Sequence, residues 1–155
     1  MSATGRVHAT ALVIGEAGVL IRGGAGAGKT ALALACIATV RSQGRFAALV
    51  SDDRVCLLLL HGRLVARVHP AIAGQVERRG LMIEAAGHLP SAVLRLVVDL
   101  VSDPQQAAKL PRLPWTGPSK TPILTVQLPH LPLDAGRQRA DQVALILAAL
   151  QQLLT

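Results

Sequence analysis

The sequence predicts a single α/β domain that binds phosphate at a junction between a strand and a helix. Its length of 155 residues is that of one ordinary domain. Short apolar runs bounded by glycine are followed by alanine- and leucine-rich runs of helical spacing, as in α/β folds. The glycine-rich stretch GGAGAGKT lies between one run of each kind. We therefore expect one domain over residues 1–155.

The first elements flank the glycine-rich stretch. Residues 7–15 (VHATALVIG) and 18–23 (GVLIRG) are apolar runs with flanking glycines, which predicts two strands joined by a tight turn. From Lys29 onward, the alanine-rich composition and the spacing of apolar residues predict a largely buried helix that ends near residues 41–44.

Strands dominate the middle of the chain. Residues 46–68 (FAALVSDDRVCLLLLHGRLVARV) predict a strand that runs into Asp52 and Asp53, and then two strands that turn at residues 61–62. Residues 92–101 (AVLRLVVDLV) predict a further buried strand.

The last third combines a loop, a strand and a helix. The proline-rich residues 109–122 predict a loop or extended segment, because proline lacks a backbone donor and interrupts helices. Residues 123–133 (ILTVQLPHLPL) predict a last strand, and residues 137–155 an amphipathic helix. The apolar stripe of this helix consists of Val143, Ile146, Leu147, Leu150 and Leu154.

Composition excludes several classes of protein. No apolar stretch reaches the roughly 18 residues of a membrane span, and the first residues lack the pattern of a secretory signal, so we expect a cytoplasmic protein without membrane contact. The net charge of +7 favours an acidic partner. Dispersed arginines and the absence of tyrosine argue against nucleic-acid binding. Cys36 and Cys56 lack metal-ligand spacing and are expected to be inert core thiols.

The glycine-rich stretch fits the G-x-x-x-x-G-K-[ST] phosphate-binding loop without a gap. Its glycines allow backbone N–H groups to point at phosphate oxygens, and the following helix adds its positive N-terminal end. The loop predicts a nucleoside triphosphate ligand with Mg²⁺, because the lysine would meet the β- and γ-phosphates and the threonine would ligate the metal. The loop residues are Gly23, Gly24, Ala25, Gly26, Ala27, Gly28, Lys29 and Thr30.

Three further groups of residues suggest phosphoryl transfer. Asp52 and Asp53 follow an apolar strand, the usual place for a metal ligand or a base. His8 lies on the strand before the loop, and a histidine near an aspartate tunes the basicity of that aspartate. The segment ERRGLMI offers Glu77 to a metal, and its two arginines offer positive charge to phosphate.

Together these motifs resemble the C-terminal catalytic domain of the HPr kinase/phosphorylase family. The resemblance rests on the histidine of VHATAL, the loop GGAGAGKT, the pair in SDD, and ERRGLMI, which is similar to the family signature E-[IV]-R-G-[IL]-G-[IL]. In that last segment the site residues are Arg78, Arg79 and Gly80. The later LPLDAGRQ loosely resembles a basic family loop, with Gly136 and Arg137 as matching residues.

The resemblance implies a fold and a donor site. It implies the PEP-carboxykinase-like variant of the P-loop fold, with a mixed sheet and flanking helices rather than an all-parallel sheet. It further implies ATP as the donor, with Lys29 holding the transferred phosphate. Thr30 and Glu77 would be metal ligands, and Asp53 would support the metal site.

The resemblance also implies an acceptor. The expected reaction is ATP-dependent phosphorylation of a serine on the phosphocarrier protein HPr, with phosphorolysis of the product by inorganic phosphate as the reverse reaction. Asp52 would take the proton from the substrate serine, and His8 would assist Asp52. A serine hydroxyl is a poor nucleophile, so a positioned carboxylate base is a sensible requirement.

The chain departs from the family pattern at several places. Long family members carry an N-terminal domain before the matched region, so we expect this chain to resemble the short form of some proteobacteria. Met82 stands where the signature has glycine. Lys109 and Arg112 are the candidates for a family arginine expected before the last strand. DAGRQ replaces a proline-glycine-arginine-asparagine pattern.

Two other functions stay open at this point. A small-molecule phosphotransferase would share the loop and need a separate acceptor pocket. A nucleotide-binding regulatory module would bind without efficient transfer, but the presence of Asp52 favours an enzyme. By analogy alone, we expect a homo-oligomer such as a hexamer.

Overall fold

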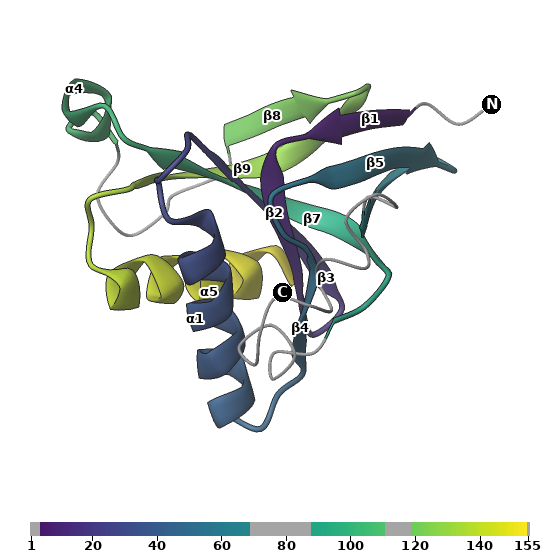
Figure 1. Cartoon of the computed structure of the whole chain (residues 1–155), viewed down its shortest axis with the longest axis horizontal. Coiled ribbons are helices and arrows are strands. Elements are labelled where there is room, and N and C mark those ends of the chain that lie inside the picture. Colours follow the sequence, from purple (N-terminus) through teal and green to yellow (C-terminus); the bar gives the residue numbers. More distant parts are fainter. Residues whose placement is uncertain (1–3, 69–87, 111–118, 155) are drawn as a thin grey trace.

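A mixed sheet with two long helices against one face forms the fold (Figure 1). The computed structural model describes residues 4–68, 88–110 and 119–154. The elements are β1 (Thr4–Val7), β2 (Ala9–Ile14), β3 (Ala17–Gly23), α1 (Lys29–Ser42), β4 (Ala47–Ser51), β5 (Val55–Leu60), β6 (Arg63–Val68), β7 (Ser91–Val101), α4 (Pro104–Ala107), β8 (Ser119–Ile123), β9 (Val126–Asp134) and α5 (Arg139–Leu154).

The long strand β7 organises the sheet. Along one edge it pairs in parallel with β3, and along the other it pairs with β6 near its start and with β9 near its end. The path of neighbouring strands is β1-β5-β6-β7-β3-β2-β4, and β9 pairs with β7 and β8. Only β3–β7 and β7–β9 are parallel pairs among the described strands. The predicted mixed sheet with flanking helices is confirmed.

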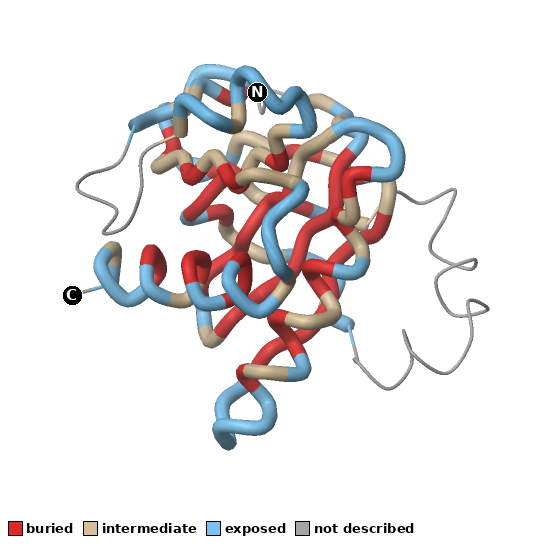
Figure 2. The backbone as a smooth tube through the Cα atoms, turned by 90° about the vertical axis from the view of Figure 1, so that its left-hand side faces the viewer, coloured by how far each residue is buried: buried red, intermediate tan, exposed pale blue. Residues whose placement is uncertain are grey.

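Two apolar cores stabilise the sheet from its two sides. Side chains alternate between faces along a strand, so Ile21 joins the core under α1 and α5, whereas Leu20 joins a core of strand residues only. Figure 2 shows these buried segments gathered in the middle of the molecule. Ile146 of α5 is 0% exposed, and burial of such a side chain contributes about 1.5–3 kcal/mol. The helices therefore pack against the strands that include β3, whose end carries the glycine-rich loop.

Most predicted elements are present. The strands before the glycine-rich loop, the helix after it, the hairpin at residues 61–62 and the strand over residues 92–101 all form. His61 and Gly62 have φ angles of 50° and 76°, which allows their tight turn. In α5 most of the predicted stripe is buried or partly buried, but Leu154 in the last turn is 52% exposed.

Three local features differ from the prediction. The run VHATALVIG is interrupted at His8, so β1 pairs with β5 while β2 pairs with β3 and β4. The predicted strand over residues 123–133 is a hairpin, because the chain turns between Ile123 and Val126 with Leu124 at φ 55°. A single helical turn, α4, precedes the proline-rich stretch, capped by the Asp103 carboxylate.

The cysteines are both free thiols. Cys36 lies on the buried face of α1, where burial raises its thiol pKa to about 12 although the charge of Arg139 opposes the shift. Cys56 is half-buried on β5, so the predicted core placement is correct for Cys36 and only partial for Cys56. None of the helices in the described ranges is long and apolar enough to cross a membrane.

Candidate active site

The glycine-rich loop joins β3 to α1, as the sequence predicted. β3 ends at Gly23, and Gly28 caps α1. Gly26 and Gly28 have φ angles of 77° and 98°, in the left-handed region that residues with a Cβ rarely adopt. The N–H of Ala27 donates to the carbonyl of Gly24 over 3.1 Å and closes the turn. Because the first N–H groups of a helix have no partners within it, the end of this loop favours an anion.

Lys29 is buried, and its ammonium group is held over the loop. The residue is 8% exposed, and Nζ donates to the carbonyls of Gly23 (2.9 Å) and Gly24 (3.2 Å). Two neutral carbonyl groups orient the ammonium without cancelling its charge. A phosphate group at the loop would therefore meet a fixed positive charge.

Asp52 is a buried carboxylate beside the start of α1. It directly follows β4 and is 4% exposed. Its Oδ1 accepts hydrogen bonds from the hydroxyl groups of Thr30 (2.6 Å) and Thr10 (3.1 Å). Ser51, the last residue of β4, pairs with Ala11 after a register shift between Ala11 and Leu12, and Asp52 follows directly. Two hydroxyl groups from separate elements thus fix the orientation of this carboxylate.

His8 pairs with the second aspartate rather than the first. Its Nε2 lies 3.2 Å from Oδ1 of Asp53, and the two side chains are 57% and 49% exposed. The sequence predicts that His8 assists Asp52. In the structure the His8 imidazole instead contacts the neighbouring Asp53. Asp53 has φ of 72°, a conformation that aspartate tolerates better than most residues. Together His8 and Asp53 form an exposed polar rim beside the buried Asp52.

The oxygen donors near α1 fit magnesium. Within residues 4–68, 88–110 and 119–154, no group of three or more His, Cys, Asp and Glu that could hold a metal is found. Magnesium prefers oxygen ligands and is commonly held by one or two carboxylates together with substrate phosphates. The Thr30 hydroxyl and the Asp52 carboxylate are such donors and are already in contact. A magnesium ion on the phosphates would therefore be held by the Thr30 hydroxyl, with the Asp52 carboxylate beside it.

The remaining predicted residues fall into two groups. Gly136 and Arg137 form the turn between β9 and α5, where the Gly136 N–H donates to the Asp134 carboxylate over 2.8 Å. Lys109 is exposed beside α4, which projects from the sheet (Figure 1). Five predicted residues lie outside the described ranges, namely Glu77, Arg78, Arg79, Gly80 and Arg112.

An ionic cluster braces the strand that leads into the loop. Arg22, just before Gly23, donates from Nε and Nη2 to the two carboxylate oxygens of Asp99, each over 2.7 Å. His130 Nε2 lies 2.5 Å from Asp99 as well. Burial alone would raise the pKa of the Asp99 carboxyl, but the hydrogen bonds and charge of Arg22, with His130, outweigh burial and lower it from 3.8. The cluster ties β3, β7 and β9 together behind the loop.

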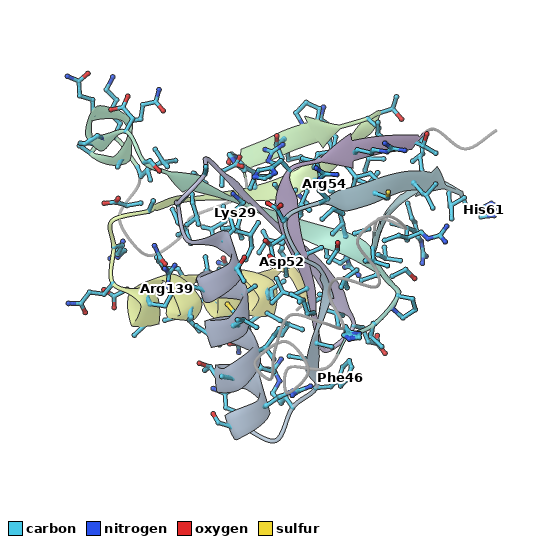
Figure 3. All side chains as sticks on the ribbon, in the orientation of Figure 1. Lys29, Phe46, Asp52, Arg54, His61 and Arg139 are labelled. Atoms are coloured by element: carbon cyan, nitrogen blue, oxygen red, sulfur yellow. The ribbon has the colours of Figure 1, made fainter. Side chains whose placement is uncertain are left out.

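Sequence reasoning missed three residues near the site. Thr10 lies in an apolar strand run, and Gln142 is a fully buried amide among the apolar residues of α5. Polar residues inside apolar runs were the available signal for both. The third residue, Arg139, begins α5 and lies against Gly28. It approaches the start of α1, where Lys29 is the first residue and where Asp52 arrives from the end of β4 (Figure 3). No local pattern marks that contact between residues 28 and 139.

Comparisons with known proteins identify curated relatives, although no protein-family model matches the chain. HPr kinase/phosphorylase of Mycoplasma mycoides subsp. mycoides SC is 30% identical over 145 residues, which cover 88% of this chain and 44% of that protein. The HPr kinase/phosphorylases of Neisseria meningitidis serogroup B and Neisseria gonorrhoeae are 31% identical over 150 residues, covering 90% of this chain and 45% of theirs. The chain thus spans less than half the length of these relatives.

A solved structure shares the fold. The HPr(Ser) kinase/phosphatase from Coxiella burnetii superimposes with a TM-score of 0.68 and 25% sequence identity. The match covers 96% of this chain and 92% of that chain. The similarity therefore extends over nearly all of both chains.

Proposed function

We propose that this chain belongs to the HPr kinase/phosphorylase family through the region that it shares with those proteins, and that it is a protein-serine kinase. It transfers the γ-phosphoryl group of ATP to a serine of HPr. The observation that supports this most is the 2.6 Å hydrogen bond between Thr30 and Asp52 beside the buried Lys29. It joins a phosphate-binding loop to a carboxylate of the kind that phosphoryl transfer requires.

The loop residues bind and orient the donor. Lys29 and the N–H groups at the start of α1 hold the phosphate chain, so the γ-phosphorus is presented toward Asp52. Thr30 would hold Mg²⁺, with Asp53 and Glu77 as further candidate ligands, which leaves the Asp52 carboxylate to act as a base. When bound, the metal would neutralise charge on the β- and γ-phosphates.

Asp52 acts on the acceptor. As the serine oxygen of HPr bonds to the γ-phosphorus, the bond from that phosphorus to the β-phosphate oxygen breaks and ADP leaves. The serine proton passes to the Asp52 carboxylate, which Thr10 and Thr30 hold in place. His8 and Asp53 line the exposed side, where the protein substrate would approach.

The same groups support the reverse direction. Inorganic phosphate would take the position of ADP and attack phosphoserine, which gives serine and pyrophosphate. Asp52 would then return a proton to the departing serine oxygen. Gly136 and Arg137, on the turn before α5, are our candidates for residues that this direction uses.

We propose the following setting for the reaction. The chain forms one catalytic domain over residues 1–155 and works in the cytoplasm, where ATP is available, without nucleic acid or membrane partners. It assembles into a homo-oligomer, an expectation that rests on the family resemblance. Sedimentation velocity tests the assembly, and a monomer at micromolar concentration would contradict it.

The test of the function is phosphoryl transfer to HPr. The protein is incubated with ATP labelled at the γ-phosphate, Mg²⁺ and either HPr or HPr whose regulatory serine is replaced by alanine. We expect label on HPr and none on the alanine variant. Pyrophosphate should then form when labelled HPr is mixed with the protein and excess phosphate.

Two results would count against the proposal. Label on neither form of HPr, in a protein that binds ATP, would indicate a nucleotide-binding module instead of a kinase. Label on both forms would indicate another acceptor residue and would remove Asp52 from its role at that serine.

A further inference from the structure

We propose that Arg139 is a second cation of the nucleotide site, which binds the α- and β-phosphates of the donor. The inference rests on the proposed function in one respect, namely that the glycine-rich loop binds a nucleoside triphosphate. Lys29 is held at the first end of that loop by the carbonyls of Gly23 and Gly24. Arg139 lies at the other end, against Gly28.

The contact between Arg139 and Gly28 is close. A Cβ built on Gly28 would lie 2.6 Å from Nη2 of Arg139 and 3.3 Å from Nη1. Gly28 is the cap of α1, and its carbonyl accepts the N–H of Leu32 over 2.9 Å. The guanidinium group therefore lies on the backbone where the loop becomes the helix. A side chain at position 28 would occupy the space that the guanidinium fills.

A buried amide holds the guanidinium in this place. Nη1 of Arg139 donates to Oε1 of Gln142 over 2.6 Å. Gln142 is 0% exposed, and its Nε2 donates to the carbonyl of Asp134 over 2.9 Å. The arginine is thus connected through Gln142 to the end of β9. Such a support limits the freedom that the side chain would lose when it binds a ligand.

The charge of Arg139 is available for an anion. In the part of the chain that the structure describes, Arg22 and Arg137 have carboxylate partners, whereas no carboxylate lies within 4.0 Å of Arg139. Its described side-chain hydrogen bond goes to the neutral Gln142. Arginine carries five donors and binds phosphate oxygens in pairs. A phosphate group at the loop would supply the missing negative charge.

The position along the loop indicates which phosphates are bound. Backbone N–H groups of this kind of loop surround the α- and β-phosphates, whereas the lysine reaches the β- and γ-phosphates. Arg139 contacts the backbone at Gly28 rather than the Lys29 ammonium. It would therefore bind the part of ATP that remains in ADP. An interaction that persists through the reaction lowers KM and leaves kcat largely unchanged.

Calorimetric binding of MgATP and MgADP to the full chain tests the inference. The variants are Arg139→Ala, Arg139→Lys and Arg139→Gln, where glutamine removes the charge but keeps a donor for Gln142. Arg45→Ala is the matched control, because Arg45 is an exposed arginine after the far end of α1. Thermal unfolding without nucleotide shows whether each variant is folded.

We expect Arg139→Ala and Arg139→Gln to weaken ATP and ADP binding by the same factor, roughly ten- to a hundredfold. Arg139→Lys should recover part of the affinity, and Arg45→Ala should bind as the wild type does. In transfer assays, KM for ATP should rise by a similar factor while kcat changes less than threefold. If Arg139→Ala does not fold, Arg139→Gln carries the same test.

Three results would overturn the inference. Folded Arg139→Ala and Arg139→Gln variants with wild-type affinity would mean that Arg139 only packs against α1. A loss for ATP without a loss for ADP would place the guanidinium at the γ-phosphate. A wild-type chain that binds neither nucleotide would refute the proposed function together with this inference, whereas the first two results leave that function standing.

Discussion

The hydroxyl group of Thr30 donates a 2.6 Å hydrogen bond to the carboxylate of Asp52 and so joins the first turn of α1 to the end of β4. The two residues are separated by 22 positions in the sequence. Their contact brings together the helix end that we propose to bind phosphate and the acidic end of a strand. The proposed phosphoryl transfer depends on this junction.

Removing the Thr30 hydroxyl should raise the magnesium requirement. In Thr30→Ala, a candidate metal ligand and a hydrogen bond to Asp52 are both lost, so we expect about a tenfold higher Mg²⁺ concentration for half-maximal transfer. Thr30→Ser keeps the hydroxyl and should stay close to wild type. Turnover measured against Mg²⁺ at fixed ATP checks this. Thr39→Ala, on the last part of the same helix, is the control, and equal Mg²⁺ curves for Thr30→Ala and Thr39→Ala would contradict the assignment.

An alanine at position 28 should displace Arg139, yet it should lower the free energy of unfolding hardly more than an alanine at Gly44 does. Gly28 and Gly44 have φ angles of 98° and 75°, so Gly28→Ala and Gly44→Ala should each cost about 1–2 kcal/mol in free energy of unfolding. Only Gly28 has Arg139 in the way of a Cβ, and a flexible side chain can move aside. Denaturant unfolding compares the two variants.

Nucleotide affinity distinguishes these glycine variants further. Gly28→Ala should weaken MgADP binding, whereas Gly44→Ala should not. In an Arg139→Ala background, Gly28→Ala should weaken MgADP binding less than it does in the wild type. The reason is that the contact between Arg139 and position 28 is already absent there. Fully additive losses in the double variant would show that the two residues act separately.

Acid should remove the stability that Asp99 contributes. The pKa of Asp99 is lowered in the folded chain, so its contribution is fully present above the unfolded value near 3.8 and is lost as pH falls through the lower folded value. Asp99→Asn should therefore cost about 1–3 kcal/mol at pH 7, with a smaller difference from wild type below pH 3.8. Urea unfolding across pH 2.5–7 measures this.

The control for the acid experiment is Glu16→Gln. Glu16 is an exposed carboxylate in the turn between β2 and β3, so this variant should follow the wild type at every pH. A constant difference between wild type and Asp99→Asn over the whole range would mean that ionisation of Asp99 does not contribute to stability.

Local patterns were sufficient for the parts of the site that are close in sequence. Glycines at positions of positive φ and a lysine before an apolar run predict the loop, because each of these features acts within a few residues. The hairpin at residues 61–62 was visible for the same reason. The aspartates at the end of β4 were visible as charges that follow an apolar run.

The missed features depend on distant contacts or on unusual turns. The turn between β8 and β9 places Leu124 at φ 55°, although leucine rarely adopts that conformation, so the sequence contains no turn signal there. The break at His8 arises because β1 and β2 pair with different strands. The approach of Arg139 to Gly28 depends on how α5 packs against α1, which periodicity within either helix does not specify.

The central claim is that Asp52 accepts the proton when HPr serine is phosphorylated, and single-turnover transfer by Asp52→Asn tests it most directly. Enzyme in excess over γ-labelled ATP is mixed with HPr, and MgATP affinity is measured on the same samples. We expect the first-order rate of HPr labelling to fall by roughly a hundred- to ten-thousandfold while ATP remains bound at the concentration used. Labelling by Asp52→Asn at the wild-type rate would contradict the account.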